Sequence, residues 1–517
     1  FFFFLKPAKK PAKKGQPRNA NKNEIFLSAS LLAQYLFAKA PVEFLEAKSS
    51  ENLIEICRSV KSEFDAFIQA DTPLTVRIDW KGDFAAAYII LGDRPFIVNS
   101  TRECIVARGV SLNVYLHPII IRDGQRISCA YVELKDINRE ECDLLKVQLE
   151  QTLEHLILVT DDFTPMLVQV ETVARLLESK SSDSLYPVKE RRETLQFLRW
   201  LSDGGFIFSG LSVWKPLSES EFSEGSHQFS ERDVILGIHK LSSTYGRQLA
   251  EELQEDLTLA SRSDQLFSMS KLRTESLIQK RLRLVNITIR ERSTDGKCVT
   301  FYQISGLLTS KALSEESSSV PILRQKLKDL LDIEGAIEQS HDYKSMINIF
   351  NAMPKEEALQ LDTPDLQSLV HTALYIQNNN ESAVSIREVQ SGRSVLALVV
   401  IPRDRFNSET RKKLQSHIEK LFNASSESSE YYLDMSNKGF ARLYFSVLVS
   451  DSFSVNLNLQ SLKDDIRVLI RDWREQLRDR IFSSELFDSP HEMWNVYGHA
   501  FGEDYVKLQR TDEAEQD

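Results

Sequence analysis

The sequence lacks the short motifs that most often mark an active site. None of its eighteen glycines falls into the patterns G-x-G-x-x-G or G-x-x-x-x-G-K-[ST], in which a glycine turn lets the backbone approach a dinucleotide or triphosphate. The patterns H-E-x-x-H and G-x-S-x-G are also missing, and no group of histidines and cysteines has the spacing of zinc ligands. We therefore predict no complete catalytic site, no dinucleotide-binding site and no metal site in these residues.

Cysteine is scarce, and long apolar runs are missing. The five cysteines are widely separated and form no C-x-x-C pair, a pattern typical of reduced and mostly buried thiols in the cytoplasm. No run of about 18 or more apolar residues exists, so we expect no membrane-spanning helix. Phe1–Phe4 precede a group of lysines, which is the reverse of the order found in a secretory signal. We therefore expect a cytoplasmic protein.

The charge is unevenly distributed. The whole chain has a formal net charge of −11, which provides no overall basic surface for nucleic acid. Residues 1–24 oppose this trend with seven lysines and arginines against Glu24 alone, and their prolines and like charges predict a disordered tail. One interpretation of this tail is a tether to anionic lipid or nucleic acid. The interpretation we favour is a solvated tail or the ragged end of a fragment.

Length and pattern divide the 517 residues into segments. At roughly 100–200 residues per domain, the chain has room for about three or four domains. Beyond the tail, we predict an N-terminal helical segment at 25–73, a first module of strands and helices at 74–165, a mixed and helical linking region at 166–383, a second such module at 384–452, and a C-terminal helical segment at 453–517.

The first module has a mixed pattern of strand and helix signals. The turn Gly92–Pro95 separates two parts of it, because glycine and proline punctuate the chain and aspartate can bond its own backbone. The order βαββα predicts an α+β fold of ferredoxin-like character, a small sheet covered on one face by two helices. The expected elements are strands at Leu74–Trp80 and Phe84–Leu91, a helix at Phe96–Arg108, strands at Val110–Ile121 and Ile127–Leu134, and a helix at Asn138–Leu158.

The second module repeats a similar order of signals. Its loop at Pro402–Arg405 precedes a helix, as the loop at Gly92–Pro95 does in the first module, although the residues differ. We therefore interpret the two modules as a diverged repeat. The expected elements are strands at Val384–Val389 and Val395–Ile401, a helix at Ser408–Phe422, and strands at Tyr431–Asp434 and Ala441–Leu448.

The nine histidines are scattered singly. His117 lies in an apolar strand pattern, where it is either an acid–base group or a structural histidine with satisfied hydrogen bonds; we favour the second. Ser340, His341 and Asp342 are adjacent in sequence, so they do not form a catalytic triad, whose members converge from separate elements. We predict instead that Ser340 caps the N-terminus of a helix.

Two loops are the candidate ligand sites. Asp93 and Arg94 precede a helix N-terminus, where unpaired amides favour a carboxylate. Arg94 would bind the carboxylate of an amino acid and Asp93 its ammonium group. In the second module, Arg403, Asp404 and Arg405 invite the same interpretation. The alternative, which we favour for both loops, is an aspartate turn that only starts the helix.

Several collinear motifs together resemble the large NAD-specific glutamate dehydrogenases of bacteria. Residues 92–100 and 116–118 are similar to the family's D-x-P-F-L-V-D-S and H-P, with Asn99 in place of the usual acid. Gln279-Lys280 departs from the family's His-Arg. The remaining matches extend the resemblance to residues 75–450: 197–201 and 206–210 resemble F-L-x-W-L and F-x-F-L-G, 306–310 and 320–326 resemble G-L-x-T-S and I-P-x-L-R-x-K, 340–342 resemble S-H-D, 354–357 resemble P-R-D-E, and 401–407 resemble V-P-R-D-R-Y-N.

The resemblance implies two ACT-like modules joined by helical segments. It also implies a non-catalytic N-terminal regulatory and assembly region of an enzyme that converts L-glutamate, NAD and water to 2-oxoglutarate, ammonia and NADH. NAD would belong to the parent enzyme and would not bind to this chain, because the family's catalytic portion lies further C-terminal. The implied partners are that catalytic domain, further copies of the chain and an amino-acid effector, with no nucleic acid and no membrane. The alternative is a stand-alone amino-acid-sensing or scaffold protein without dehydrogenase activity.

Overall fold

The computed structural model describes residues 29–179, 186–216, 229–263, 265–292, 298–379, 382–389, 393–425, 428–435, 439–449, 459–470, 473–484, 488–502, 505–506 and 511–514. The basic tail predicted at 1–24 lies outside these residues. The chain divides into two compact units, Phe1–Gln151 and Thr152–Asp517. None of the described helices is both long and apolar enough to cross a membrane. Helices accompany three antiparallel sheets, so the predicted α+β class is confirmed.

The first unit is built on one antiparallel sheet. Its elements are α1 (Ala29–Phe37), α2 (Val42–Glu46), α3 (Ser50–Ala70), β1 (Leu74–Trp80), β2 (Ala85–Gly92), α4 (Ile97–Val106), β3 (Ser111–Leu116), β4 (Ile119–Arg122), β5 (Gln125–Lys135) and the first part of α5 (Arg139–Asp161), which continues into the second unit. The strand order is β1-β2-β5-β3, and β4 also pairs with β5. The central strands β2 and β5 are therefore hydrogen-bonded on both sides.

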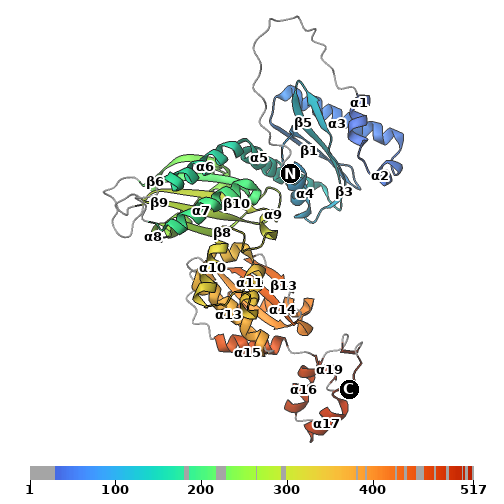
Figure 1. Cartoon of the computed structure of the whole chain (residues 1–517). Coiled ribbons are helices and arrows are strands. Elements are labelled where there is room, and N and C mark those ends of the chain that lie inside the picture. The colour runs from blue at the N-terminus through green and yellow to red at the C-terminus, as the bar shows by residue number, and fades with distance from the viewer. Residues whose placement is uncertain are drawn as a thin grey trace, which may run out of the picture. The chain divides into compact units, whose positions relative to one another are not determined.

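Both faces of this sheet are covered by helices. On one face, Leu32, Val60 and Phe64 of the first helices pack against Tyr88 and Tyr131 of the central strands. The alternate residues of β2 are buried on the opposite face, where α4 and α5 lie (Figure 1). The two helices of the predicted sandwich thus lie on one face, and the helices of the N-terminal segment, which the prediction left unplaced, cover the other face. The sequence A-A-A-Y-I-I-L-G of β2 is apolar without alternation, the pattern of a strand that is buried on both faces.

Both strands expected before the first helix of the module are observed, as β1 and β2, and they form a hairpin. The order is therefore ββαββα and not βαββα. The single strand expected at Val110–Ile121 is interrupted at His117 and Pro118, and both pieces pair separately with β5. Proline has no backbone N–H to donate, so it cannot continue a ladder of hydrogen bonds.

The second unit begins with helices and a five-stranded sheet. Leu257 and Ala260 of α8 pack against Trp214 and Phe301 of this sheet, whose order is β7-β6-β10-β9-β8. It is called the central sheet below. The elements are α6 (Phe163–Ser179), α7 (Val188–Trp200), η2 (Leu201–Gly205), β6 (Phe206–Pro216), β7 (Phe229–Gly237), η3 (Ile238–Lys240), α8 (Thr244–Arg262), β8 (Phe267–Glu275), β9 (Arg283–Arg292) and β10 (Cys298–Leu308).

A group of helices and a four-stranded sheet follow. The elements are α9 (Ser310–Ser314), α10 (Leu323–Ile333), α11 (His341–Ala352), α12 (Lys355–Gln360), α13 (Thr363–Asn379), β11 (Ala383–Val389), β12 (Ser394–Pro402), η4 (Arg403–Arg405), α14 (Ser408–Leu421), β13 (Ser429–Asp434), β14 (Phe440–Leu448), α15 (Leu459–Leu469), α16 (Trp473–Ser483), α17 (Pro490–Tyr497) and α19 (Thr511–Ala514). Strands β11 to β14, with η4, α14 and α15, are called the second module below.

The second module has the same topology as the sheet of the first unit. Its order is β11-β12-β14-β13, again two strands, a helix, two strands and a helix. One face packs against α14 and α15 through Leu414, Ile418 and Ile466. On the other face, α13 lies against β11, where Arg387 pairs with Asp365 at 3.3 Å. The shared topology supports the predicted repeat, including the helices that precede each sheet.

Candidate functional site

The charged side chains of the first predicted ligand loop are hydrogen-bonded to neighbouring groups of the protein. Asp93 accepts a hydrogen bond from Arg126 Nε at 2.8 Å, and Arg94 Nε donates to the carbonyl of Gly92 at 3.3 Å. Phe96 precedes α4 in the left-handed region, at φ 71°. Glycine is favoured in that conformation, so a side chain here adds both strain and bulk beside the helix N-terminus. The structure therefore places Asp93 and Arg94 together, each with a partner from the protein.

The second predicted loop differs in conformation. Arg403, Asp404 and Arg405 form the short turn η4, in which Arg403 and Asp404 are exposed. Arg405 pairs with Glu475 of α16 at 2.8 Å. Helix α14 is capped by Asn407, which accepts a hydrogen bond from Thr410 N at 2.8 Å. The two loops thus share a place in the repeat but not a side-chain arrangement.

The histidine motifs have structural roles. His117 Nε2 lies 2.6 Å from the hydroxyl of Ser128, and burial lowers the pKa of His117. Ser340 accepts a hydrogen bond from Tyr343 N at 3.1 Å, so it is the N-cap that we predicted. His341 and Asp342 are almost fully exposed, with no third group of a triad beside them among the described residues.

A chain of buried hydrogen bonds crosses the central sheet. Ser212 Oγ and His239 Nδ1 lie 2.7 Å apart, His239 Nε2 lies 2.9 Å from Ser305 Oγ, and Ser305 donates to Asn286 at 3.1 Å. Asn286 in turn donates to Asp256 of α8 at 2.8 Å. Because Ser305 gives its hydrogen to Asn286, it accepts from His239, which places the histidine proton on Nε2. All five residues are buried. These hydrogen bonds therefore hold the interior of the sheet together and do not form an exposed catalytic triad.

The chain of hydrogen bonds ends in an ion pair with the second module. Asp256 accepts from Ser270 of β8 and from Arg393, which precedes β12. Arg393 also pairs with Glu255 at 3.1 Å. Burial raises the pKa of Asp256, while Arg393 acts in the opposite direction. A hydrogen-bonded path therefore leads from β6, through His239, to the first hairpin of the second module.

A second buried cluster surrounds Lys271 of β8. Its ammonium lies 2.9 Å from Glu356, 3.3 Å from Glu357 and 2.6 Å from Glu430, and it donates to the hydroxyl of Tyr432 at 3.1 Å. Burial alone would lower the pKa of Lys271, but these carboxylates raise it well above its usual value. Burial raises the pKa of Glu356, whereas Lys271 holds that of Glu430 below its usual value. The cluster joins β8 to α12 and to β13.

A cavity in this unit lies beside these two clusters. It has a volume of about 560 Å³ and is lined by α7, α8, β8, α10 and the segment between α12 and α13, with Thr288 of β9. Lys326 is one wall residue, and its ammonium donates to the carbonyls of Ala358, Leu359 and Leu361 at 3.2, 2.8 and 2.6 Å. Burial lowers the pKa of Lys326 to about 7. Ligand pockets commonly have about 300–1,000 Å³, so this cavity can hold a small metabolite.

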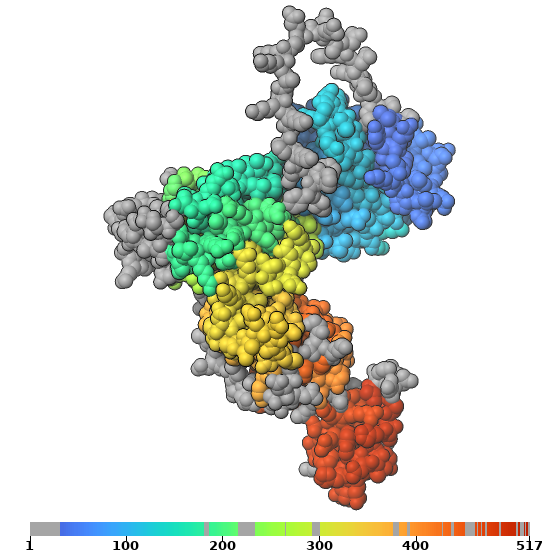
Figure 2. Space-filling model, viewed as in Figure 1, coloured from blue at the N-terminus to red at the C-terminus, as the bar shows by residue number. Residues whose placement is uncertain are grey.

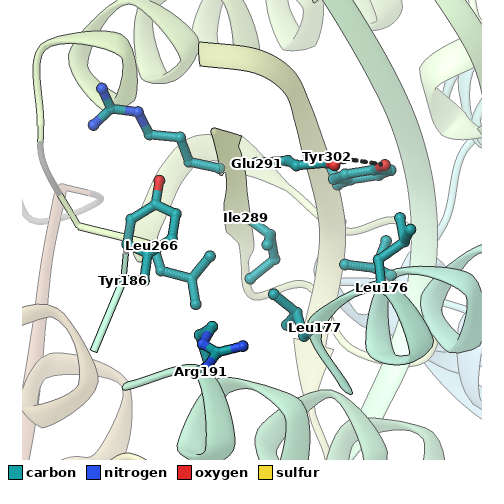
Figure 3. Close-up of a pocket in the computed structure, with 10 residues that line it drawn as sticks. Leu176, Leu177, Tyr186, Arg191, Leu266, Ile289, Glu291 and Tyr302 are labelled. Carbon is teal, nitrogen blue, oxygen red and sulfur yellow. Dashed lines mark hydrogen bonds between the residues drawn. The ribbon is translucent and has the colours of Figure 1, made fainter. Parts of the chain in front are cut away.

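A second cavity is too small for that role. Its volume of about 30 Å³ lies among Tyr186, Arg191, Leu266 and Ile289, and Figure 3 shows these side chains around it. The dashed line in Figure 3 is the hydrogen bond from Tyr302 to Glu291, at 3.2 Å. A single water needs about one probe sphere of roughly 10–15 Å³. The space therefore suits one or two waters and not an organic ligand.

Most of the residues in these clusters were missed by sequence reasoning. Ser212, His239 and Asn286 come from separate elements, and no local pattern joins them. The sequence did single out Glu356 and Glu357, because they belong to the motif at 354–357 that resembles P-R-D-E. Within the described parts of the chain, no group of three or more histidine, cysteine, aspartate or glutamate side chains is arranged to hold a metal ion.

Comparison with known proteins locates two family models in the second unit. The model described as "Glutamate dehydrogenase, helical motif 1" matches residues 320–379. The model described as "Glutamate dehydrogenase, ACT2 domain" matches residues 383–474. The first match begins just before α10 and ends with α13, and the second contains the second module. The group of helices that ends with α13 and the sheet that follows it thus match adjacent parts of one family.

Similarity to whole proteins extends much further along the chain. The NAD-specific glutamate dehydrogenase of Halomonas elongata is 23% identical over 509 residues, which are 92% of this chain and 31% of that protein. The enzyme of the same name from Pseudomonas aeruginosa is 21% identical over 473 residues, 86% of this chain and 29% of that protein. The chain therefore spans less than a third of the length of these relatives.

One solved structure also aligns, but with a low TM-score and a low sequence identity. The crystal structure of PelD from Pseudomonas aeruginosa PAO1 covers 59% of this chain and 83% of its own, with 12% identity and a TM-score of 0.13. The family models and the long alignments agree with the collinear motifs from residue 92 to residue 407. Over most of its length, the chain is similar to the large NAD-specific glutamate dehydrogenases of bacteria.

Proposed function

We propose that this chain is a non-catalytic N-terminal regulatory and assembly region of a large NAD-dependent glutamate dehydrogenase. The parent enzyme would convert L-glutamate, NAD and water to 2-oxoglutarate, ammonia and NADH in the cytoplasm. NAD would be bound by the catalytic portion and not by these residues. The partners would be that catalytic portion and further copies of the chain. The names of the relatives and the family models support this proposal.

The observation that carries a regulatory role is the buried linkage between the second module and the central sheet. Arg393 binds Asp256, and Glu430 binds Lys271, so two charged contacts fix one hairpin and one edge strand of the module. Coupling between distant sites needs packed elements with a shared equilibrium. A ligand or subunit that moved the second module would act directly on α8 and β8 through these contacts.

An amino acid remains the proposed effector of the two loops. Both loops present positive and negative side chains near the start of a helix. These are Asp93 and Arg94 in the first loop, and Arg403, Asp404 and Arg405 in the second. Titration calorimetry with the twenty common amino acids tests this proposal, with Asp93→Ala and Arg403→Ala as the variants. Binding that neither variant weakens would remove the loops from the proposal.

The proposed function is tested by activity and by the coding sequence. Purified residues 1–517, mixed with glutamate and NAD, should form no NADH above a buffer blank. The reading frame that encodes the chain should continue into a strand, a glycine turn and a helix of the dinucleotide-binding kind. Turnover by the chain itself would overturn the non-catalytic assignment. A natural stop codon after Asp517 would favour the alternative, a stand-alone amino-acid-sensing or scaffold protein.

A further inference from the structure

The sheet of the first unit has two edges that differ in construction. One edge consists of the short strands β3 and β4, which are interrupted at Pro118 and shifted in register between Leu112 and Val114. Short strands, bulges and prolines prevent an edge strand from pairing with another chain. The other edge is β1 (Leu74–Trp80), which has no proline, no glycine and an unbroken register with β2. Among the described residues, no strand pairs with the outer side of β1.

The strand β1 exposes an aromatic side chain on one face of the sheet and a pair of opposite charges on the other. Trp80 is 46% exposed, and tryptophan is enriched at protein interfaces because its ring offers a large apolar surface. Arg77 and Asp79 share the face that α3 covers, where Arg77 donates to Asp79 at 2.8 Å and to Glu63 of α3 at 2.5 Å. The edge thus presents a positive and a negative side chain two residues apart on one face.

Symmetry limits the ways in which β1 can pair with β1 of a second copy. Side chains and backbone groups alternate along a strand, so an antiparallel pair of identical strands must be centred on a residue that faces its own symmetry mate. The registers with the largest overlap are centred on Val76, Arg77 and Ile78. The second places two arginines opposite each other, and the first places Arg77 opposite Thr75. The register centred on Ile78 places Arg77 opposite Asp79 twice, and such opposite-charge pairs stabilise a sheet.

These new pairs would add to the ion pair that each copy already contains. A guanidinium has five N–H donors and a carboxylate about four acceptor positions, and Arg77 gives only its Nε–H to Asp79. Each Arg77 can therefore bind the Asp79 of both copies, which gives a network of four charges around the twofold axis. Such networks contribute more than isolated exposed ion pairs do. On the other face, the same register places Trp80 opposite Val76 and Ile78 opposite its symmetry mate, so an apolar row forms there.

We propose that two copies of this chain associate through β1, as antiparallel strands in the register centred on Ile78. The two sheets would form one continuous sheet, and this twofold contact is closed because each copy uses the same strand. A single pair of strands is a small protein interface, so we expect a dimer that dissociates at micromolar concentrations. The inference rests on the proposed function only in taking a second copy of the chain as a partner. The assay for NADH formation tests the non-catalytic assignment separately.

Charge reversals on β1 test both the surface and its register. The mass of residues 1–517 is measured by analytical ultracentrifugation over a range of concentrations. Arg77→Asp places two acidic side chains opposite each other at both pairs, and Asp79→Arg places two arginines there. Each single variant should therefore weaken the dimer by about tenfold or more. The double variant with both substitutions restores opposite charges in the register centred on Ile78, so its dimer should be about as stable as that of the wild type.

The matched control is Arg122→Asp, a charge reversal on β4 at the other edge of the same sheet, which should dimerise as the wild type does. Circular dichroism reports whether each variant keeps its fold. A wild-type dimer that both single variants leave intact would place the contact on another surface and refute the assignment to β1, while association of copies would stand. Losses that the double variant does not recover would also refute it. A wild-type chain that stays monomeric at every concentration would remove both the surface and self-association from the proposals.

Discussion

At the scale of single residues, Gly210 is constrained by the histidine beside it. A Cβ atom at this position would overlap the ring of His239 and lie 2.9 Å from its Nε2. The ring cannot move without losing its bonds to Ser212 and Ser305. The glycine of the F-x-F-L-G-like motif thus has a packing reason that requires no ligand.

We predict that Gly210→Ala lowers the free energy of unfolding by about 1–3 kcal/mol, the usual cost of inserting a methyl group into a packed core. Urea denaturation followed by circular dichroism measures the change. Gly92→Ala is the control, because its Cβ would meet only the Arg94 side chain at an ordinary 3.5 Å. Equal stability of the two variants would mean that the ring of His239 adapts freely.

His155 is a buried histidine whose proton is disfavoured in the folded protein. Its exposed fraction is 5%, it lies on the ring of Tyr245 at 4.8 Å, and burial lowers its pKa from 6.5 to about 4. In the unfolded chain the His155 imidazole binds a proton as the pH falls through 6.5, whereas in the folded chain it binds one only at about pH 4. The resulting contribution to stability is present above pH 6.5 and is lost as the pH falls through 4.

We predict that His155→Phe flattens the pH dependence of unfolding between pH 6.5 and 4. Phenylalanine keeps the aromatic contact with Tyr245 and cannot titrate. Urea midpoints measured across this range for the wild type, for His155→Phe and for the exposed control His341→Phe give the comparison. The idea fails if the three proteins lose stability with the same slope, because His155 would then titrate normally in the folded state.

At the scale of secondary-structure elements, local patterns predicted the strands well where they were bounded by turns. The strand expected at Val384–Val389 is observed as Ala383–Val389, and that expected at Val395–Ile401 as Ser394–Pro402. The covering of both sheet faces was missed, although β12 is buried at every residue and contains no polar alternation after Ser394. An apolar strand without polar alternation thus indicated that both faces of its sheet are covered.

Edge and centre of a sheet could not be told apart from the sequence. Val132, in the strand expected at Ile127–Leu134, is an example. It lies in β5, between β2 and β3, and its exposed fraction is zero. Proline there would disrupt the sheet itself. Strand order depends on contacts between distant segments, so a test of association at an edge belongs on β1 or β3. Self-association of the chain stays a prediction that light scattering can check.

The corner between α12 and α13 depends on one ammonium group. Lys326 is the donor for three carbonyls that end α12. We predict that Lys326→Met costs about 1–3 kcal/mol of stability, because buried carbonyls lose their partner. Hydrogen exchange should rise in α12 and in the first turn of α13. Lys328→Met, an exposed position on the same helix α10, is the control and should change neither. Unchanged exchange at the corner in Lys326→Met would show that another donor replaces the lysine.

At the scale of the whole second unit, the candidate site depends on residues that are far apart in the sequence. Lys271 lies 159 residues from Glu430, and Arg393 lies 137 residues from Asp256. Composition and periodicity describe neighbours along the chain, so they cannot predict such pairs. The motif resemblance did indicate Glu356 and Glu357 without assigning them a partner. Sequence reasoning thus predicted the family and most elements, while the linkage between them required the three-dimensional fold.

Removing this linkage should release the second module from the central sheet. Breaking a buried ion pair by deleting one partner costs about 3–5 kcal/mol, because the other charge stays buried. We predict that Lys271→Met and Arg393→Gln each lower stability by an amount in this range. In both variants, hydrogen exchange should rise in β8 and in the β11–β12 hairpin. The control is Lys215→Met, whose pair with Asp233 is exposed and should be worth less than about 1 kcal/mol.

The carboxylates left behind determine how the Lys271→Met variant responds to pH and to a second substitution. Without the ammonium, the pKa values of Glu356 and Glu430 should rise, so protonation relieves the buried charge and the deficit in stability should shrink as the pH falls from 7 towards 5. Adding Glu357→Gln to Lys271→Met should likewise restore part of the loss, giving a coupling energy above about 1 kcal/mol in a double-mutant cycle. Purely additive losses, with a deficit independent of pH, would mean that Lys271 acts through packing alone. In that case Arg393 would be left as the charged contact that transmits movement of the second module to the central sheet.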